Sequence, residues 1–234
     1  MIYLYSGTPG SGKSLHTAEE IYYKLKFGKQ VLICNFPINM DLFKPEARER
    51  FIFKMDSEMT PQFFIEFAEK YWKEHPDFTV RQKEGHLKIY IDEAQRLFNA
   101  REWQKTYEKG WNNFFSLHRH LGYDIILITQ YDRMLDRQIR ALIEYEYVHR
   151  KIANIGLGGK ILNMAAMGGL FICVQKWYPQ REKIGVEMFR YSKKYDGLYD
   201  THMLFEKMGN KEPSPASGDD GAPADQAAAP VLPT

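Results

Sequence analysis

The chain has 234 residues, of which 44% are hydrophobic and 15% aromatic, and this is enough apolar area for one full α/β core. Its formal net charge of +2 excludes the global positive field that marks a general nucleic-acid binder. No apolar run reaches the roughly 18–20 residues that a membrane helix needs, and the apolar start leads straight into a glycine loop. We therefore expect a soluble, cytoplasmic chain without a signal peptide.

The first part of the chain predicts strands that alternate with helices. Residues 2–6 form a short apolar run that stops at a glycine, and apolar residues spaced three and four apart follow over 15–25. This order indicates a strand, a loop and a helix. A second apolar run over 31–36 predicts a parallel strand that is reached through this helix. Residues 45–50 and 61–72 predict two further helices, the second with a broad apolar side.

The remaining elements follow the same alternation and then change. Apolar runs predict strands over 87–91 and 124–129, and the aromatic-rich stretch 101–121 between them has mostly helical spacing. Later the apolar residues recur at every second position, with two β runs over 170–177 and 186–191. We expect these two runs to extend the sheet or to form a hairpin at its edge.

The composition changes at the end of the chain. Residues 209–234 contain five of the eleven prolines and no aromatic residue, and one lysine with four acidic residues gives them a charge of −3. Such a segment cannot bury a core, so we expect it to be disordered. Residues 1–208 are then the folded domain, and they carry a charge of +5.

Two cysteines, Cys34 and Cys173, stand far apart in apolar, strand-like surroundings. This pattern predicts two buried thiols in a reducing compartment rather than a disulfide or a metal site.

The strongest motif is the phosphate-binding pattern G-x-x-x-x-G-K-[ST], which also stands where it must, after a strand and before a helix. Glycines let backbone N–H groups turn toward a β-phosphate, and the start of the following helix favours negative charge. We expect Lys13 to reach the β- and γ-phosphates of ATP or GTP, and Ser14 to hold Mg²⁺. The residues of the loop are Gly7, Thr8, Pro9, Gly10, Ser11, Gly12, Lys13 and Ser14.

A second pair of site residues follows the strand over 87–91. A carboxylate at the carboxyl end of a neighbouring parallel strand comes to lie beside the phosphates, so Asp92 is the predicted metal ligand. The adjacent Glu93 is predicted to orient and deprotonate the attacking water, which distinguishes a hydrolysing motor from a kinase.

Other candidates follow from position alone. Thr129 and Gln130 end the next apolar strand, where a hydroxyl and an amide could sense the γ-phosphate. Arginine supplied by a neighbouring subunit can stabilise developing charge, and Arg119 is the first candidate. The further candidates are Arg133, Arg137 and Arg140.

Three segments together resemble the zonular occludens toxin (Zot) family, which includes the assembly ATPases of filamentous bacteriophages. These segments are YLYSGTPGSGKS at 3–14, IYIDEAQ at 89–95 and LHRHLGYDIILITQ at 117–130. The resemblance extends over roughly residues 1–205, and the combination of segments is far more specific than the phosphate loop alone.

The resemblance implies a RecA-like, additional-strand α/β P-loop NTPase: a parallel sheet flanked by helices, with a β-hairpin near the C-terminal end. It implies a homo-oligomeric motor at the cytoplasmic face of the host inner membrane, with phage assembly and export proteins and phage single-stranded DNA as partners. It places Lys13 and Ser14 in the Walker A pair, Asp92 and Glu93 in the Walker B pair, Thr129 and Gln130 at the sensor strand, and Arg119 as the intersubunit finger. Family members usually carry a membrane helix after this domain, so attachment through a missing segment or a partner is expected.

Two other functions stay open at this point. The phosphate loop also resembles that of nucleoside monophosphate kinases, although Asp92 followed by Glu93 argues against a kinase. A nucleotide-gated interaction module with little hydrolysis is the second alternative. Hydrolysis that needs no acceptor would separate a motor from a kinase, and turnover far above that of a Glu93 variant would separate an enzyme from a module.

Overall fold

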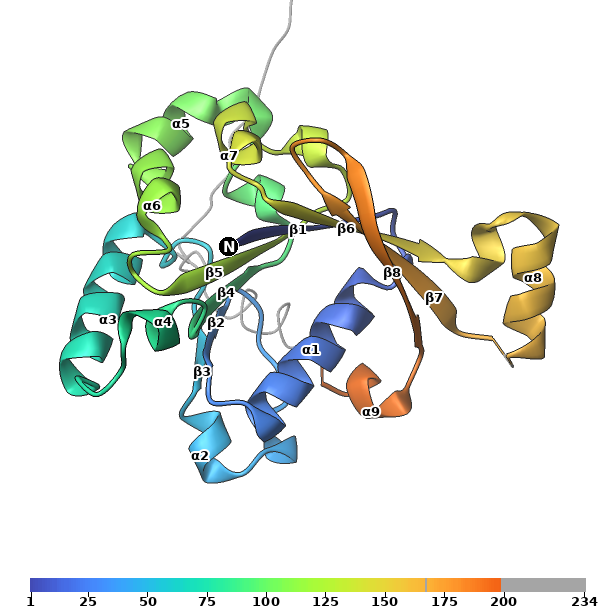
Figure 1. Cartoon of the computed structure of the whole chain (residues 1–234), viewed down its shortest axis with the longest axis horizontal. Helices are drawn as coiled ribbons and strands as arrows, with labels where there is room; N and C mark the ends of the chain where they lie inside the picture. Colours follow the sequence, from blue (N-terminus) through green and yellow to red (C-terminus); the bar gives the residue numbers. More distant parts are fainter. Residues whose placement is uncertain (167, 199–234) are drawn as a thin grey trace, which may run out of the picture.

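One continuous mixed sheet forms the centre of the molecule, as the computed structural model shows (Figure 1). The structure describes residues 1–166 and 168–198. The predicted disordered segment 209–234 lies outside these residues. In space the strands follow the order β3-β2-β4-β5-β1-β6-β7-β8. The strands are β1 (Ile2–Ser6), β2 (Val31–Cys34), β3 (Phe51–Phe53), β4 (Leu87–Ile91), β5 (Tyr123–Ile128), β6 (Tyr145–Lys151), β7 (Leu170–Trp177) and β8 (Glu182–Arg190).

The strand order confirms the additional-strand prediction. β1 through β6 pair in parallel, and β5 lies between β1 and β4. The expectation that β4 would be a direct neighbour of β1 is wrong, because β5 separates the two strands. Their carboxyl ends still open at one edge of the sheet, since parallel strands share their direction. We call this edge, which follows Ser6, Ile91 and Ile128, the site edge.

β7 and β8 form the predicted hairpin and extend the sheet beside β6 in antiparallel pairing. β8 begins at Glu182, four residues before the expected start at Val186. Its first residues, Glu182, Lys183 and Ile184, are all exposed, and such an edge strand shows no alternation of apolar and polar residues that would reveal it in the sequence.

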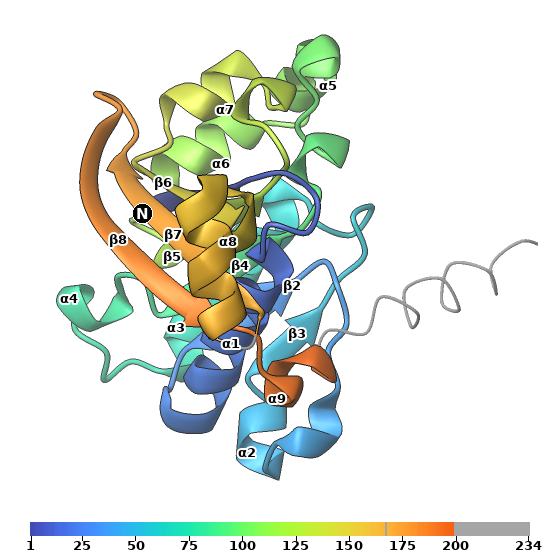
Figure 2. The same cartoon turned by 90° about the vertical axis from the view of Figure 1, so that its right-hand side faces the viewer.

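Helices cover both faces of the sheet (Figure 2). They are α1 (Lys13–Phe27), α2 (Pro45–Arg48), α3 (Pro61–Glu74), α4 (Val80–Lys83), α5 (Trp103–Glu108), α6 (Trp111–Leu117), α7 (Arg137–Ala141), α8 (Gly156–Ala165) and α9 (Lys193–Asp196). The expected helix over 101–121 is divided in two, because Gly110 takes a left-handed φ of 77° between α5 and α6. α8 was not predicted, since its three glycines argue against a helix. Across residues 1–166 and 168–198, no helix combines the length and apolar character that crossing a membrane requires.

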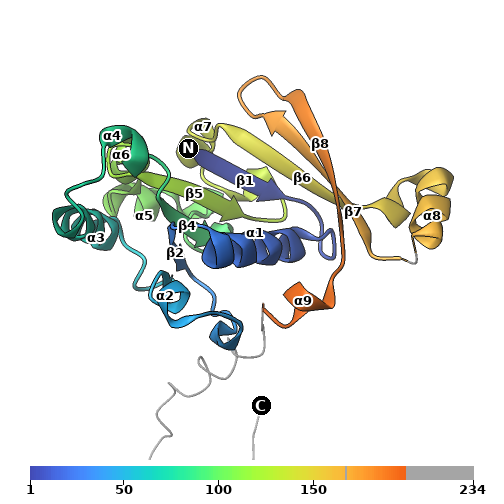
Figure 3. The ribbon, with the colours of Figure 1, turned by 60° about the horizontal axis from the view of Figure 1, so that its bottom comes forward.

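Two apolar layers hold these helices against the sheet. On one face α1, α2 and α9 pack against β1, β2, β4 and β5, with Leu25, Leu32 and Tyr90 at the centre (Figure 3). On the other face α3, α6 and α7 pack around Phe64, Trp111 and further residues of the same strands. The strands between the layers are buried on both faces, so they read as continuous apolar runs. This double burial fixes the site edge between two rigid layers.

The start of α3 offers a small stability test. The Thr60 hydroxyl accepts a hydrogen bond from the Phe63 N–H at 3.1 Å and so satisfies one donor that the helix leaves unpaired. Thr60→Ala is expected to lower the free energy of unfolding by about 1 kcal/mol, measured by urea denaturation. Thr60→Ser keeps the hydroxyl and should lose much less. Equal losses in the two variants would show that the cap does not account for the effect.

Candidate functional site

The loop that joins β1 to α1 takes the shape of a phosphate cradle. Gly7 and Gly12 have φ values of 146° and 97°, in the region that favours glycine. A Cβ at Gly7 would lie 2.5 Å from the His149 carbonyl oxygen, and one at Gly12 would lie 2.7 Å from the Phe171 ring. The Gly7 N–H donates to the Gln130 carbonyl at 3.2 Å. The loop is therefore fixed at its start by the strand end that the sequence marked as a sensor.

Lys13 lies over this loop. Its ammonium donates to the carbonyl oxygens of Gly7 at 2.6 Å and Thr8 at 3.3 Å. Burial lowers the pKa of Lys13, and the charges of Asp92 and Glu93 act in the opposite direction. These two carboxylates are thus close enough to act on the Lys13 charge, although they follow it by about 80 positions in the sequence. The site edge brings the predicted Walker A and Walker B residues together.

The backbone of Asp92 is held by a side chain that the motif did not include. Asn35, buried just after β2, accepts a hydrogen bond from the Asp92 N–H at 2.7 Å and donates to the Asp92 carbonyl at 2.9 Å. The same Asn35 amide donates to Asp56 at 2.8 Å. The Asp92 carboxylate in turn accepts from the Glu93 N–H at 2.9 Å. Asn35 therefore fixes the direction in which the chain leaves β4.

Glu93 has a left-handed backbone, with φ 48° and ψ 49°, which is uncommon for a residue with a side chain. Its carboxylate accepts a hydrogen bond from the Gln95 amide. The Gln95 carbonyl oxygen accepts from the Thr129 hydroxyl at 2.8 Å. A continuous chain of hydrogen bonds thus joins the predicted sensor threonine to the predicted base. Gln95 is a site residue that analysis by position did not select, although it lies within the segment 89–95 that carries the family resemblance.

The donor set at this edge suits Mg²⁺, which prefers oxygen ligands and keeps several waters. A hydroxyl at Ser14 on the first turn of α1 and a carboxylate at Asp92 are oxygens available beside Lys13. The hydroxyl of Ser11 is buried in the loop without a hydrogen-bond partner among the described residues. A buried polar group needs a partner, and a phosphate oxygen would supply one.

A pocket of ≈ 330 Å³ opens beside the loop on the α1 side of the sheet. Polar atoms of the loop form one wall, and aromatic rings form the other. Planar aromatic faces stack well on nucleobases. The residues that line it are Gly10, Ser11, Gly12, Lys13, Ser14, Leu15, Ala18, Phe171, Tyr191 and Tyr195. The three aromatic residues come from β7 and from the segment that follows β8, which sequence reasoning assigned only to the edge of the sheet.

Arg119 lies away from this site. It precedes β5, whereas Thr129 follows it, so the six residues of β5 place Arg119 about 20 Å away at the opposite edge. There its guanidinium forms an ion pair with Glu144, next to the first residues of β1. The structure does not bring Arg119 to the nucleotide edge of its own chain. Arg133, Arg137 and Arg140 lie in the connection between β5 and β6.

An arginine that sequence reasoning missed lines a second cavity, on the other face of β6. Arg181 has a φ of 57° and forms ion pairs with Asp132 at 2.8 Å and Glu146 at 3.4 Å. The cavity measures ≈ 580 Å³, and its walls include Gly7 and Gln130. The two carboxylates already neutralise the charge of Arg181 in this structure.

Similar solved structures show the same kind of core. A viral-type ATPase domain of known structure is 8% identical, with 85% of this chain and 84% of that chain covered and a TM-score of 0.52. The N-terminal domain of zonular occludens toxin from Neisseria meningitidis is 17% identical, with 86% and 98% covered and a TM-score of 0.47. The genome packaging NTPase B204 from Sulfolobus turreted icosahedral virus 2, in complex with AMPPCP, is 14% identical, with 82% and 97% covered and a TM-score of 0.48.

The first of these likenesses, with the strand order, shows a RecA-like P-loop NTPase fold. No curated protein sequence is significantly similar to this chain. The model of the family described as zonular occludens toxin (Zot) matches residues 1–203, which is most of the chain. The chain belongs to the Zot family.

Proposed function

We propose that this chain binds ATP with Mg²⁺ and hydrolyses it, as the motor of a filamentous-phage type of virion assembly and export. One observation carries the proposal: Lys13, Glu93 and Thr129 lie at one edge of the sheet, and hydrogen bonds link Glu93 to Thr129 through Gln95. A binding module would need the lysine and the loop, whereas the held glutamate has a use in hydrolysis.

The roles follow from the geometry. The loop N–H groups and the start of α1 would bind the phosphates, and Lys13 would exchange its contacts with Gly7 and Thr8 for the β- and γ-phosphates. Glu93 would accept a proton from the attacking water. Mg²⁺, held by Ser14 and Asp92, would neutralise charge on the phosphate oxygens. Phe171, Tyr191 and Tyr195 would stack on the base, and these rings favour ATP and GTP alike.

The kinase alternative is disfavoured by the state of Glu93. A kinase takes its attacking hydroxyl from a bound acceptor, and its catalytic carboxylate serves that acceptor. Here Glu93 follows Asp92 directly and is held by Gln95, within the same strand end that supplies the metal ligand. This arrangement suits a water as the nucleophile.

Membership of the Zot family supports the motor part of the proposal. We infer a homo-oligomer at the cytoplasmic face of the host inner membrane, with phage assembly proteins and single-stranded phage DNA as partners. Arg119 stays a prediction as the finger between subunits. It would act only if a neighbouring copy presents the edge that carries Arg119 and Glu144 to the nucleotide.

Turnover and native mass together test the proposal. The purified chain should hydrolyse ATP in Mg²⁺ buffer without an added acceptor, and its mass by light scattering should rise to a closed oligomer when ATP and Mg²⁺ are present. Hydrolysis that appears only with a nucleoside monophosphate would establish the kinase instead. Binding without turnover in every assembly state would establish the module.

The hydrogen-bond chain through Gln95 gives a graded prediction. Gln95→Ala removes the link between Glu93 and Thr129, so the base loses the contact that orients it. We expect kcat to fall by about 10–10²-fold with little change in KM, because misplacement of a reacting group by about 1 Å costs up to 10²-fold. Gln104→Ala, at an exposed position of α5, is the control. A rise in KM with unchanged kcat would place Gln95 in nucleotide binding.

A further inference from the structure

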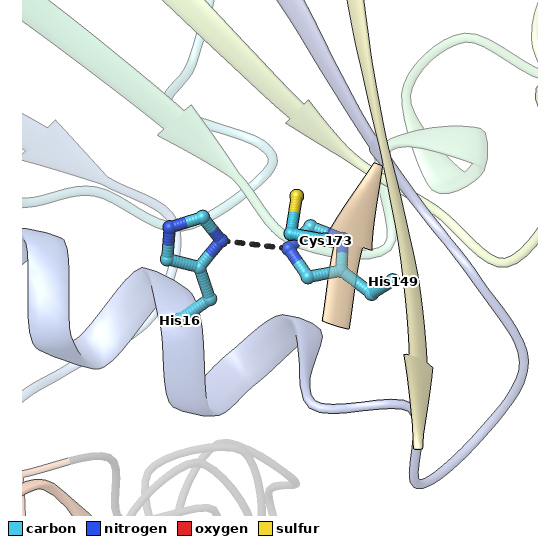
Figure 4. A group of neighbouring side chains, drawn as sticks. All are labelled: His16, His149 and Cys173. Carbon is cyan, nitrogen blue, oxygen red and sulfur yellow. Dashed lines mark hydrogen bonds between the residues drawn. The ribbon is translucent and has the colours of Figure 1, made fainter. Parts of the chain in front are cut away.

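Two histidines and a cysteine meet under α1, at a place the proposed reaction does not use (Figure 4). His16 comes from the first turns of α1, His149 from β6 and Cys173 from β7. His149 and Cys173 are direct cross-strand partners, so both side chains point to the same face of the sheet. One ligand atom from each of the three buried residues lies within 4.8 Å of the others.

The hydrogen bonds fix the protonation of both rings. His149 Nδ1 lies 3.2 Å from the Ser6 carbonyl oxygen, which only accepts, so Nδ1 carries a proton. Burial lowers the pKa of His149 to about 3, and the ring is neutral. Its Nε2 is then an acceptor and receives the Nδ1 proton of His16 at 2.7 Å. The Nε2 lone pair of His149 thus points toward His16 and Cys173.

We propose that His16 Nδ1, His149 Nε2 and the Cys173 thiolate form a Zn²⁺ site. Nitrogen and sulfur are the ligands that Zn²⁺ prefers in proteins. Histidine ligands of zinc commonly donate their second ring N–H to a backbone carbonyl, and His149 makes this contact with Ser6. The interpretation of Cys173 as an inert thiol is thereby revised, whereas Cys34, which joins no such group among the described residues, keeps it.

A fourth ligand stands next in the same row. Glu187 on β8 is the cross-strand partner of Cys173, so its side chain shares the face of Cys173 and His149. Its charge already contributes to the raised pKa of Cys173, which shows that the two groups interact. A thiolate and a carboxylate together cancel the charge of Zn²⁺, and a neutral complex is the form that a buried site tolerates.

The site also has an entrance. A surface pocket of ≈ 460 Å³ is lined by both His16 and Glu187. An ion can therefore meet the exposed carboxylate of Glu187 first and then the buried nitrogen and sulfur ligands. A proposed metal site needs such a path in addition to its ligands.

Binding requires only local changes. Zn–N distances of about 2.0–2.1 Å in a tetrahedral site separate two nitrogens by about 3.3 Å, so the two rings must move apart from their 2.7 Å contact. The Cys173 thiol releases its proton to solvent, and His16 carries its own proton on Nε2 instead of Nδ1. The ion then takes the place of the proton that the two rings share.

Such an ion would join the phosphate loop to the hairpin. His16 stands three residues after Lys13, and His149 contacts the carbonyl of Ser6, the last residue before the loop. The metal would hold α1, β6 and β7 together directly behind the nucleotide. The consequence is a rise in thermal stability on metal binding that does not depend on nucleotide.

Cobalt titration of the reduced full chain, freed of metal by a chelator, tests the site. Co²⁺ at equimolar ratio should produce tetrahedral d–d bands and a thiolate-to-cobalt charge-transfer band, and Zn²⁺ should displace both. Cys173→Ala should lose the charge-transfer band. Cys34→Ala, the matched buried cysteine on the same face of the sheet, should keep it.

Glu187→Gln changes an exposed position and leaves the three buried ligands in place, so it serves even if Cys173→Ala fails to fold. It should weaken Co²⁺ binding by about tenfold or more, whereas Glu182→Gln on the same strand should not. The proposal is overturned if the wild-type chain gives no charge-transfer band, if the band survives Cys173→Ala, or if Glu187→Gln and Glu182→Gln bind Co²⁺ equally.

Discussion

Glu93→Gln is expected to reduce ATP hydrolysis by about 10²–10⁴-fold while ATP still binds. Glutamine keeps the size of the side chain and can still accept the hydrogen bond from Gln95, but it cannot take a proton from water. Lys13, Ser14 and Asp92 are unchanged, so the phosphate and metal contacts persist. The loss corresponds to about 3–5 kcal/mol of barrier. Steady-state turnover and the Kd of a fluorescent ATP analogue are the two measurements.

Glu102→Gln is the control for this experiment, since it removes a charge from an exposed glutamate whose ion pair is with the equally exposed Lys105. It should leave both turnover and Kd unchanged. Full activity in Glu93→Gln would remove the base from the mechanism, and the left-handed backbone of Glu93 would then have a structural cause alone. A large rise in Kd would instead place Glu93 among the groups that hold the nucleotide.

The core of the fold could be predicted because its signals are local. The phosphate loop needs glycines at fixed positions, and its strand and helix adjoin it in sequence, so the residues 2–25 carry the whole pattern. Doubly buried strands appear as short apolar runs for the same physical reason. β3, with three residues, and the exposed start of β8 have neither signal, and both escaped prediction.

The contacts that organise the site could not be predicted, because they join residues that only the strand order brings together. Asn35 reaches Asp92 across the pairing of β2 with β4, 57 residues apart. His16 and His149 are 133 residues apart and meet because β6 pairs with β1 while α1 covers both. Arg119 is the converse case. Its position between two strands suggested a role at the nucleotide, but it precedes its strand and so lies at the wrong edge of its own subunit.

These long-range contacts converge on the first residue of the loop. Gly7 is bonded through its N–H to Gln130 and lies against the carbonyl of His149. The sensor strand on one side and the strand before α8 on the other are thus both in contact with the phosphate cradle. A change in the phosphates has a direct structural route to β6 and to the hairpin of β7 and β8, which lies at one side of the molecule (Figure 1).

Lys13→Ala is expected to weaken ATP binding by about 10²–10⁴-fold and to abolish measurable hydrolysis. Lys13 is the cation predicted at the β- and γ-phosphates, and a hydrogen bond to a charged group contributes about 1.5–3 kcal/mol, so two such contacts account for this range. The loss has a second cause. Without nucleotide the Lys13 ammonium holds the carbonyl oxygens of Gly7 and Thr8, so its removal also loosens the cradle that the phosphates must enter.

Isothermal titration with a non-hydrolysable ATP analogue measures the first effect, and turnover measures the second. Lys29→Ala is the matched control, because Lys29 is exposed just beyond the other end of the same helix. It should change neither quantity. Circular dichroism and the melting temperature establish whether Lys13→Ala is folded. A folded Lys13→Ala protein with wild-type affinity would mean that the phosphates lie elsewhere, and the assignment of the loop itself would fail.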